Sequence, residues 1–457
     1  MVPFMEAVEK LRGSFTSTSG IRLEPRPLFA LGLAIFFVAY VFMPNIVSFA
    51  LSLSLFLAPL WLPFMLVGGA LILWLTLKRG EFIANQKNVL LEIKPPRNLV
   101  KTPLAMEAFL SSIHLSPGES NWYVVWFLGG VRPWWSLEIA SFEGQVHFFI
   151  WTRANFRRIV ESQMYAQYPG VQIMEAPDYT RFIDTESDDI GGVWGADFKH
   201  TSEAPLPIKT YIEYGMDKVQ KEPEQVDPLA NLIEFMGSIG KGEYLWLQFI
   251  VRVHKGERYG KKKNKKTGKQ YTWKDEADEL VDEIRKKTRD PYIDPATGEE
   301  RPGFPNPTKG QSEKIAAIER NVSKLAFDVG ARSVYIAKKD KFNPVMITHM
   351  IGLFKPFSTE GWNGINSSDW LKRFDDYPWE IGAAKLKRLY AKRLVEAFRR
   401  RQFFHDPFYY GIPQDKVMVM STEELATVFH IPSHSVETPG LTRIQSATGE
   451  APPNLPT

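Results

Sequence analysis

The 457-residue chain contains no cysteine. This absence excludes disulfide bonds, thiolate zinc sites, iron–sulfur clusters and cysteine nucleophiles. An excess of charge of one sign is also lacking, because 56 basic and 52 acidic side chains leave a net charge of only +4. Such a balance favours neither nucleic acid nor a membrane as a partner, so any preference must come from the local distribution of charge.

Common catalytic motifs are lacking as well. No segment has the spacing GxxxxGK[ST] of a phosphate-binding loop, nor GxSxG or HExxH. Gly237–Tyr244 (GSIGKGEY) has glycines and a lysine but not that spacing. His430 and His434 are the two histidines that lie close together; Pro432 separates them and no third ligand is evident. The sequence therefore predicts no catalytic site, no metal site and no cofactor.

Charged residues are absent from Pro27 to Leu77. A membrane-spanning helix needs about 20 apolar residues, so we expect two spans, near Leu28–Val47 and Leu57–Leu77, forming a transmembrane hairpin over residues 28–77. The run is too long for the apolar region of a cleaved signal peptide, which has about 7–15 residues. It contains no ionisable residue, which disfavours a channel or transporter.

Basic residues flank this run on both sides. By the positive-inside rule, residues 1–27 and the long C-terminal portion are both expected in the cytoplasm, in a two-span protein of the inner membrane. The basic residues that precede the run are Lys10, Arg12, Arg22 and Arg26, and those that follow it are Lys78, Arg79 and Lys87.

The rest of the chain reads as a membrane-anchored α+β protein. Over residues 88–185 the patterns predict strand, helix, strand, strand, helix and strand, the order of a ferredoxin-like (split βαβ) unit. The segments are Leu90–Pro96, Thr102–Leu115, Trp134–Phe142, Gln145–Thr152, Ala154–Tyr168 and Val171–Pro177.

A second ferredoxin-like unit is predicted over residues 200–342, with a charged insertion at 256–310. Its expected strands are Ile208–Gly215, Glu243–Lys255 and Arg332–Lys339, and its expected helices are Asp227–Ile239 and Ser312–Val329. A helical region, 343–432, should follow. The Pro-, Ser-, Thr- and Gly-containing residues 433–457 are expected to form an extended linker.

Two basic clusters are candidate sites for DNA or anionic lipid headgroups. Solvated surface is the alternative for both, and acidic residues after the first cluster could neutralise part of it. The first comprises Lys261, Lys262, Lys263, Lys265, Lys266 and Lys269; the second, on a predicted helix, comprises Lys392, Arg393, Arg399, Arg400 and Arg401. The aromatic segment Asn121–Ser136 is either a buried strand or a contact with the membrane or another subunit.

Two segments resemble bacterial proteins related to type IV secretion and conjugation ATPases. LLEIKPPR together with the segment from Trp134 to Thr180 is similar to their membrane-proximal domain. The segment from Val417 to Thr457 looks like the connection to the motor domain of longer members. The resemblance implies a part in a translocation machine at the inner membrane. The chain ends where longer members begin their nucleotide-binding fold, so no ATPase residue is carried over and the motor is expected in another chain or in the missing part of a split protein.

The first hypothesis is accordingly a non-catalytic, membrane-anchored subunit that binds a P-loop ATPase in trans. DNA and a second copy of the chain are further candidate partners. The alternative is a membrane-tethered protein that binds nucleic acid or anionic lipid without a motor partner. An unrecognised membrane enzyme is a third hypothesis, which lacks a cluster of acid, base or nucleophile to support it.

Overall fold

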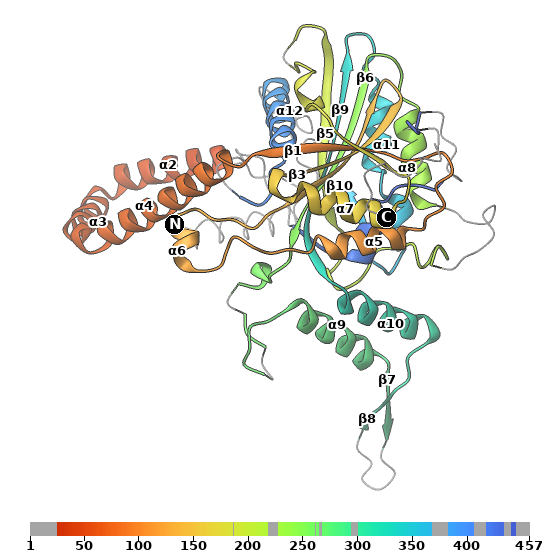
Figure 1. Cartoon of the computed structure of the whole chain (residues 1–457). Coiled ribbons are helices and arrows are strands. Elements are labelled where there is room, and N and C mark those ends of the chain that lie inside the picture. The colour runs from red at the N-terminus through yellow and green to blue at the C-terminus, as the bar shows by residue number, and fades with distance from the viewer. Residues whose placement is uncertain are drawn as a thin grey trace. The chain divides into compact units, whose positions relative to one another are not determined.

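The computed structural model describes residues 25–185, 187–217, 227–260, 262–264, 267–293, 300–367, 383–405, 417–433 and 440–444. The chain divides into two compact units, Met1–Lys78 and Arg79–Thr457 (Figure 1). The first consists of apolar helices, and the second, the sheet body, contains every described strand.

The prediction of two membrane-spanning helices is wrong. Within the described part of the chain, only α4 (Ala58–Ala84) is on its own long and apolar enough to cross a membrane. α2 (Pro25–Phe42) and α3 (Pro44–Phe56) meet at a 115° bend, so together they have the length and composition of one broken span or of a re-entrant loop rather than of a straight span. The break has a local cause: Pro44 offers no N–H, and the residue before a proline, Met43, is disfavoured in the helical conformation. Met43 has φ −135° and ψ 55°.

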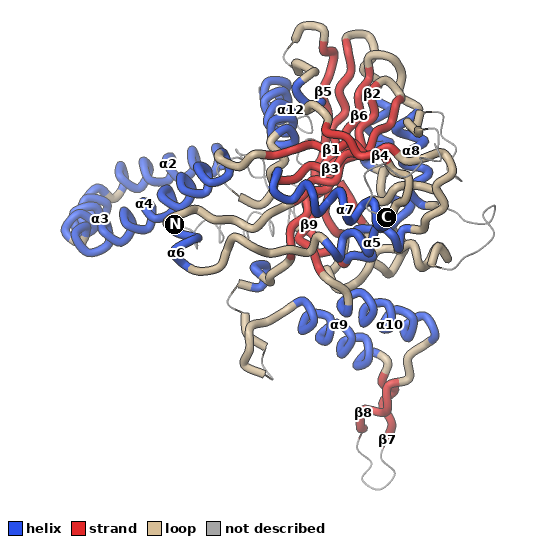
Figure 2. Tube along the Cα trace, in the orientation of Figure 1, coloured by secondary structure: helices blue, strands red, loops and turns tan. Residues whose placement is uncertain are grey.

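One antiparallel sheet of nine strands forms the sheet body (Figure 2). Its order is β10-β5-β9-β6-β2-β3-β1-β4, and β11 also pairs with β9. The strands are β1 Asn88–Lys94, β2 Trp135–Phe142, β3 Gln145–Arg153, β4 Gln172–Glu175, β5 Ile190–His200, β6 Glu243–Val253, β9 Ala326–Lys338, β10 Ile365–Ser367 and β11 Met418–Ser421.

The prediction of two separate ferredoxin-like units is therefore also wrong. β2 and β6, expected in different units, pair from Trp135 with Val251 to Phe142 with Tyr244, and this ladder joins all the strands into one sheet. The reason lies in burial: nearly every residue of both strands is buried, so neither strand is a solvated edge. The two halves of the sheet, on either side of the β2–β6 ladder, have the same strand order. Counted from the outer edge inward, β4-β1-β3-β2 and β10-β5-β9-β6 each place the last, first, third and second strand of that half in chain order.

Helices cover both faces of the sheet. Ser141 of β2 donates to Met236 of α8 (Pro228–Gly237) on one face. On the other face, Trp246 of β6 contacts Phe398 of α12 (Ala383–Arg399) at 5.5 Å between ring centroids. The remaining helices of this unit include α5 Pro103–Ser112, α6 Trp122–Trp126, α7 Arg157–Gln167, α11 Pro344–Ile351 and α13 Thr422–Val428.

The predicted insertion forms an arm between β6 and β9. Its helices, α9 (Trp273–Lys287) and α10 (Lys309–Ser323), pack against each other and carry the hairpin β7 (Arg289–Ile293) and β8 (Glu300–Pro305) (Figure 1). Both helices begin with a capping box, at Thr272 and Thr308. A small cluster that includes Val281 and Ile318 is separate from the core of the sheet.

Three local predictions need correction. Ile208–Gly215 is not a strand but begins with irregular backbone and continues as turns. The first strand of this half of the sheet is instead β5, which the sequence pattern did not predict. The interpretation of Asn121–Ser136 as a buried strand is wrong for its first half, which holds the short exposed helix α6, whereas its second half is buried and leads into β2. Part of the expected linker is packed: Leu441 is buried and bridges to Val146. Residues 445–457 lie outside the described residues.

Candidate functional site

A row of buried polar side chains crosses one face of the sheet. Neighbouring strands place Asp197 opposite Arg332, Arg332 opposite Gln248, and Gln248 opposite Glu138. All four side chains are fully buried. Buried polar groups must find partners to avoid the cost of desolvation. Some partners lie within the row, as Asp197 pairs with Arg332, and others come from the end of α12.

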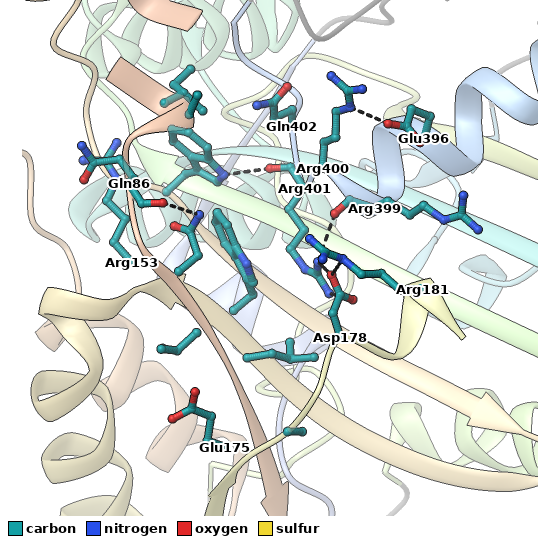
Figure 3. Close-up of a pocket in the computed structure, with 18 residues that line it drawn as sticks. Gln86, Arg153, Glu175, Asp178, Arg181, Glu396, Arg399, Arg400, Arg401 and Gln402 are labelled. Atoms are coloured by element: carbon teal, nitrogen blue, oxygen red, sulfur yellow. Dashed lines mark hydrogen bonds and ion pairs between the residues drawn. The ribbon is translucent and has the colours of Figure 1, made fainter. Parts of the chain in front are cut away.

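Arg401 is the centre of this network. Its Nε lies 2.8 Å from Glu138 Oε1. Its Nη1 lies 2.9 Å from Asp178 Oδ2 (Figure 3). Glu138 also accepts hydrogen bonds from Ser136, Tyr179 and Gln248. Arg401 has a left-handed backbone, with φ 51°, which ends the helical run and turns its guanidinium toward the sheet.

Ionisation in this network follows from the pairing. Burial by itself disfavours the charged form of Arg401, but the carboxylates of Glu138 and Asp178 outweigh it and raise its pKa. Burial likewise opposes the charge on Asp178, and hydrogen bonds from Arg401 and Thr180 lower its pKa below the usual range. Both carboxylates are thus engaged in an internal ion pair, which makes them poor candidates for general acid or base chemistry.

A cleft of about 730 Å³ opens beside this network, on the same face of the sheet (Figure 3). Its wall includes Ile83 and Ala84 from the last turn of α4, the indoles of Trp134 and Trp151, and several arginines. Figure 3 shows Arg153 and Gln86 on one side of the cleft and Arg399, Arg400 and Arg401 on the other. The three acids in the wall are all paired: Glu175 with Arg157, Asp178 with Arg401, and Glu396 with Arg400.

Arg153 differs from the other buried arginines. It is only 7% exposed, and its guanidinium donates to the carbonyls of Val131 and Arg132, each at 3.3 Å. It lies over the rings of Phe82 and Trp134. No carboxylate pairs with it in the described part of the chain. Burial accordingly lowers its pKa to about 10. A nearly buried cation without a counter-anion, in the wall of a cleft, is a suitable partner for an anionic group.

Other guanidinium groups gather near this cleft. The pKa of His405 is lowered well below its usual value, first by burial and then by the charges of Arg252, Arg79, Arg132 and Arg153. Arg252 pairs with Asp328 at 2.9 Å, and Arg132 pairs with Glu119 at 2.8 Å and with Glu257. This end of the sheet is therefore rich in positive charge, although most of that charge is paired.

The first predicted basic cluster lies on the arm. Lys261, Lys265 and Lys266 lie outside the described residues. Lys262 stands over the ring of Tyr271 at 3.5 Å and pairs with Glu279 of α9 at 3.3 Å. Lys263 forms a bridge with Gln270, and Lys269 shares the same short hairpin. The acidic helix thus takes up at least one of these charges, and binding of DNA or lipid by the cluster stays a prediction.

The second predicted cluster divides between the surface and the interior. Arg400 forms a pair with Glu396 at 2.6 Å, and Arg393 lies over Tyr390. Arg399 donates to the carbonyls of Thr180 and Ile183. Arg401 is buried in the network above, and Lys392 also has an interaction partner. These residues therefore do not form one exposed basic face.

No group of three or more His, Asp or Glu side chains that could hold a metal ion occurs among the residues that the structure describes. Of the two neighbouring histidines of the sequence, His430 is buried, with its ring 3.1 Å from Asp227, and His434 lies outside the described residues.

Residues 75–443 match the family described as "Domain of unknown function (DUF8128)". The chain belongs to this family. No curated protein matches the sequence. The matched region covers the end of α4 and the whole described sheet, so the cleft, the Arg401 network and the arm all lie within the DUF8128 domain.

Arg153 and Glu138 of this DUF8128 protein were not candidates in the sequence. Each is one charged residue within an otherwise apolar strand, in VHFFIWTR and WSLEIASF. The position of a charge in such a strand could have marked both residues as candidates. Burial of an unpaired charge is costly, so a charge there needs a partner or a function. Glu138 meets Arg401, which lies 263 residues away, and Arg153 meets the carbonyls of a loop 21 and 22 residues earlier, so the pattern alone could not tell which charge would be paired.

Proposed function

We propose that this DUF8128 protein is a non-catalytic, membrane-anchored subunit of a type IV secretion- or conjugation-like apparatus, which holds a P-loop ATPase supplied by another chain. The observation that carries the proposal is the continuity of α4. This helix runs for 27 residues from an apolar segment into the DUF8128 domain, where Phe82 lies under the guanidinium of Arg153. A helix of that length and composition is suited to anchor the domain at a bilayer.

Two further observations support a role in binding. Glu138 and Asp178, the two acids of the Arg401 network, are engaged in ion pairs with Arg401 and are therefore not available for catalysis. The arm has its own small cluster and exposes Phe304 of β8 almost completely, at 93%. Lys78 and Arg79 directly follow the apolar segment, which favours a cytoplasmic position for the DUF8128 domain.

The test uses the full chain in lipid nanodiscs. Its ATP turnover is measured alone and with a P-loop ATPase from a neighbouring reading frame, and binding of the two is measured by interferometry. We expect no turnover by the chain alone and specific binding of the ATPase. ATP turnover by this chain alone, or no binding of the ATPase, would contradict the proposal.

Recognition of anionic lipid is a second candidate function, favoured by Arg153. The cleft lies at the end of α4, five or more residues after the apolar segment. At this distance from an anchoring segment, the phosphate of a lipid headgroup could reach the cleft. We expect the full chain in detergent to retain anionic phospholipid in native mass spectra, and Arg153→Met to lose it. Arg285→Gln, which removes an exposed cation of α9 that is paired with Glu319 and lies outside the cleft, is the matched control. Equal retention by both variants would exclude this site.

A further inference from the structure

The short helix α6 carries the most concentrated exposed aromatic surface of the DUF8128 domain outside α4. Trp122 is 69% exposed, Tyr123 52% and Phe127 48%. Their rings contact one another, with Tyr123 stacked on Phe127 at 5.4 Å, but lie away from the core. Trp126 and Leu128 add further exposed apolar area. Such a patch on a protein surface marks an interaction site.

Firm contacts at its base hold α6 in this position. The side chain of Asn121 caps the helix by accepting from Val124 N at 3.0 Å. Gly130 N donates to Val124 O at 2.9 Å. A Cβ at Gly130 would lie 2.5 Å from both Gly118 O and a methyl carbon of Val124, so only glycine permits this close approach. The aromatic rings are thus presented by a closed loop rather than by a free strand.

The same loop is tied to the end of α4. Val131 follows the glycines and accepts from the guanidinium of Arg153, and that guanidinium lies over the ring of Phe82, 5.5 Å from its centroid. Phe82 is five residues beyond Leu77, the last residue of the uncharged run. At about 1.5 Å per residue in a helix, this separation is less than 10 Å. The loop that carries α6 is therefore linked to a residue of α4 that follows the uncharged run by only five residues.

We propose that α6 is a second membrane contact of the DUF8128 domain, whose aromatic rings insert into the interfacial layer of the same bilayer that α4 crosses. Tryptophan and tyrosine favour this layer because their apolar rings enter the acyl boundary while their polar atoms stay hydrated. Two anchor points, α4 and α6, would fix the orientation of the domain on the membrane, which one helix cannot do. The inference rests on the proposed anchoring by α4.

The absence of native cysteine permits a direct test with single spin labels. Full-length variants Tyr123→Cys, Phe304→Cys and Leu66→Cys are labelled and reconstituted in phosphatidylcholine–phosphatidylglycerol vesicles. Collisions with lipid-soluble oxygen and with a water-soluble nickel chelate are then compared. Leu66 is an exposed residue of α4, and Phe304 is an exposed aromatic residue of the arm. We expect labels at 66 and 123 to favour oxygen, and the label at 304 to favour nickel.

Each outcome has a distinct meaning. If the label at 66 favours oxygen and the label at 123 favours nickel, the inference about α6 is wrong while anchoring by α4 stands. A label at 123 that is shielded from both reagents would mean that another protein surface covers α6, and this too would overturn the inference. Preference for nickel at 66 would instead contradict the proposed anchoring itself. Gly130→Ala, which should displace α6, is expected to shift the label at 123 toward nickel and to leave that at 66 unchanged.

Discussion

Arg401 and Arg153 are both buried on the same face of the sheet, but they meet opposite conditions. Arg401 faces two carboxylates, and its pKa is raised. Arg153 faces two backbone carbonyls and two aromatic rings, and its pKa is lowered to about 10. The difference shows that the charge of Arg401 is balanced within the fold, whereas Arg153 retains a charge that a ligand could neutralise.

The largest expected effect is the loss of the Arg401 pairing. Arg401→Met should destabilise the fold by about 3–5 kcal/mol, because Glu138 is left as a buried charge without its cation. Denaturation of the full chain in detergent, followed by tryptophan fluorescence, measures this change. The double variant Glu138→Leu/Arg401→Met should recover part of the loss. An additive double variant would mean that the two residues are not coupled.

Glu424 extends the comparison of paired and unpaired buried charges to an acid. Burial has the largest effect on its pKa. Burial raises its pKa from the usual 4.5 to about 7. Between these values the folded state binds more protons than the unfolded state, so stability should fall as pH rises from about 4.5 to 7. The loss is at most about 3 kcal/mol. Glu424→Gln cannot ionise and should lack this part of the pH dependence. Parallel stability–pH curves for the two proteins would disprove the assignment.

Arg153→Met should change stability far less than Arg401→Met, by about 1 kcal/mol or less, because no carboxylate loses its partner and the lost ring contacts are offset by removal of a desolvated charge. Its main effect should be on retention of anionic lipid. Denaturation under the same conditions gives the comparison. A loss as large as that of Arg401→Met would show that Arg153 is chiefly structural.

The smallest effect is expected on the arm. Lys262→Gln removes an exposed pair with Glu279 and a contact with Tyr271, for which about 0.2–1 kcal/mol is typical. Salt should reduce the difference between variant and wild type, since exposed pairs are screened. A salt-independent loss of several kcal/mol would mean that Lys262 supports the fold of the arm. Titration with duplex DNA at two salt concentrations tests the predicted nucleic-acid binding in the same variant.

Several elements could be predicted from local pattern. β2, β3 and α7 lie where their periodicity and turn residues placed them. The predictions that failed depended on partners. Ile208–Gly215 has a strand-like composition but no strand beside it, whereas Ile190–His200 is a strand because β9 pairs with it. The exposed position of α6 similarly depends on contacts at Gly130.

The sequence by itself determined the uncharged apolar segment, the absence of cysteine chemistry and of common nucleotide motifs, and most of the strands, because these depend on composition and on neighbours along the chain. The tertiary structure decided that these strands form one sheet, that Arg401 is paired and Arg153 is not, and that α6 is exposed. Each of these outcomes depends on side chains from distant parts of the chain meeting in space, and the local order of residues does not specify such meetings.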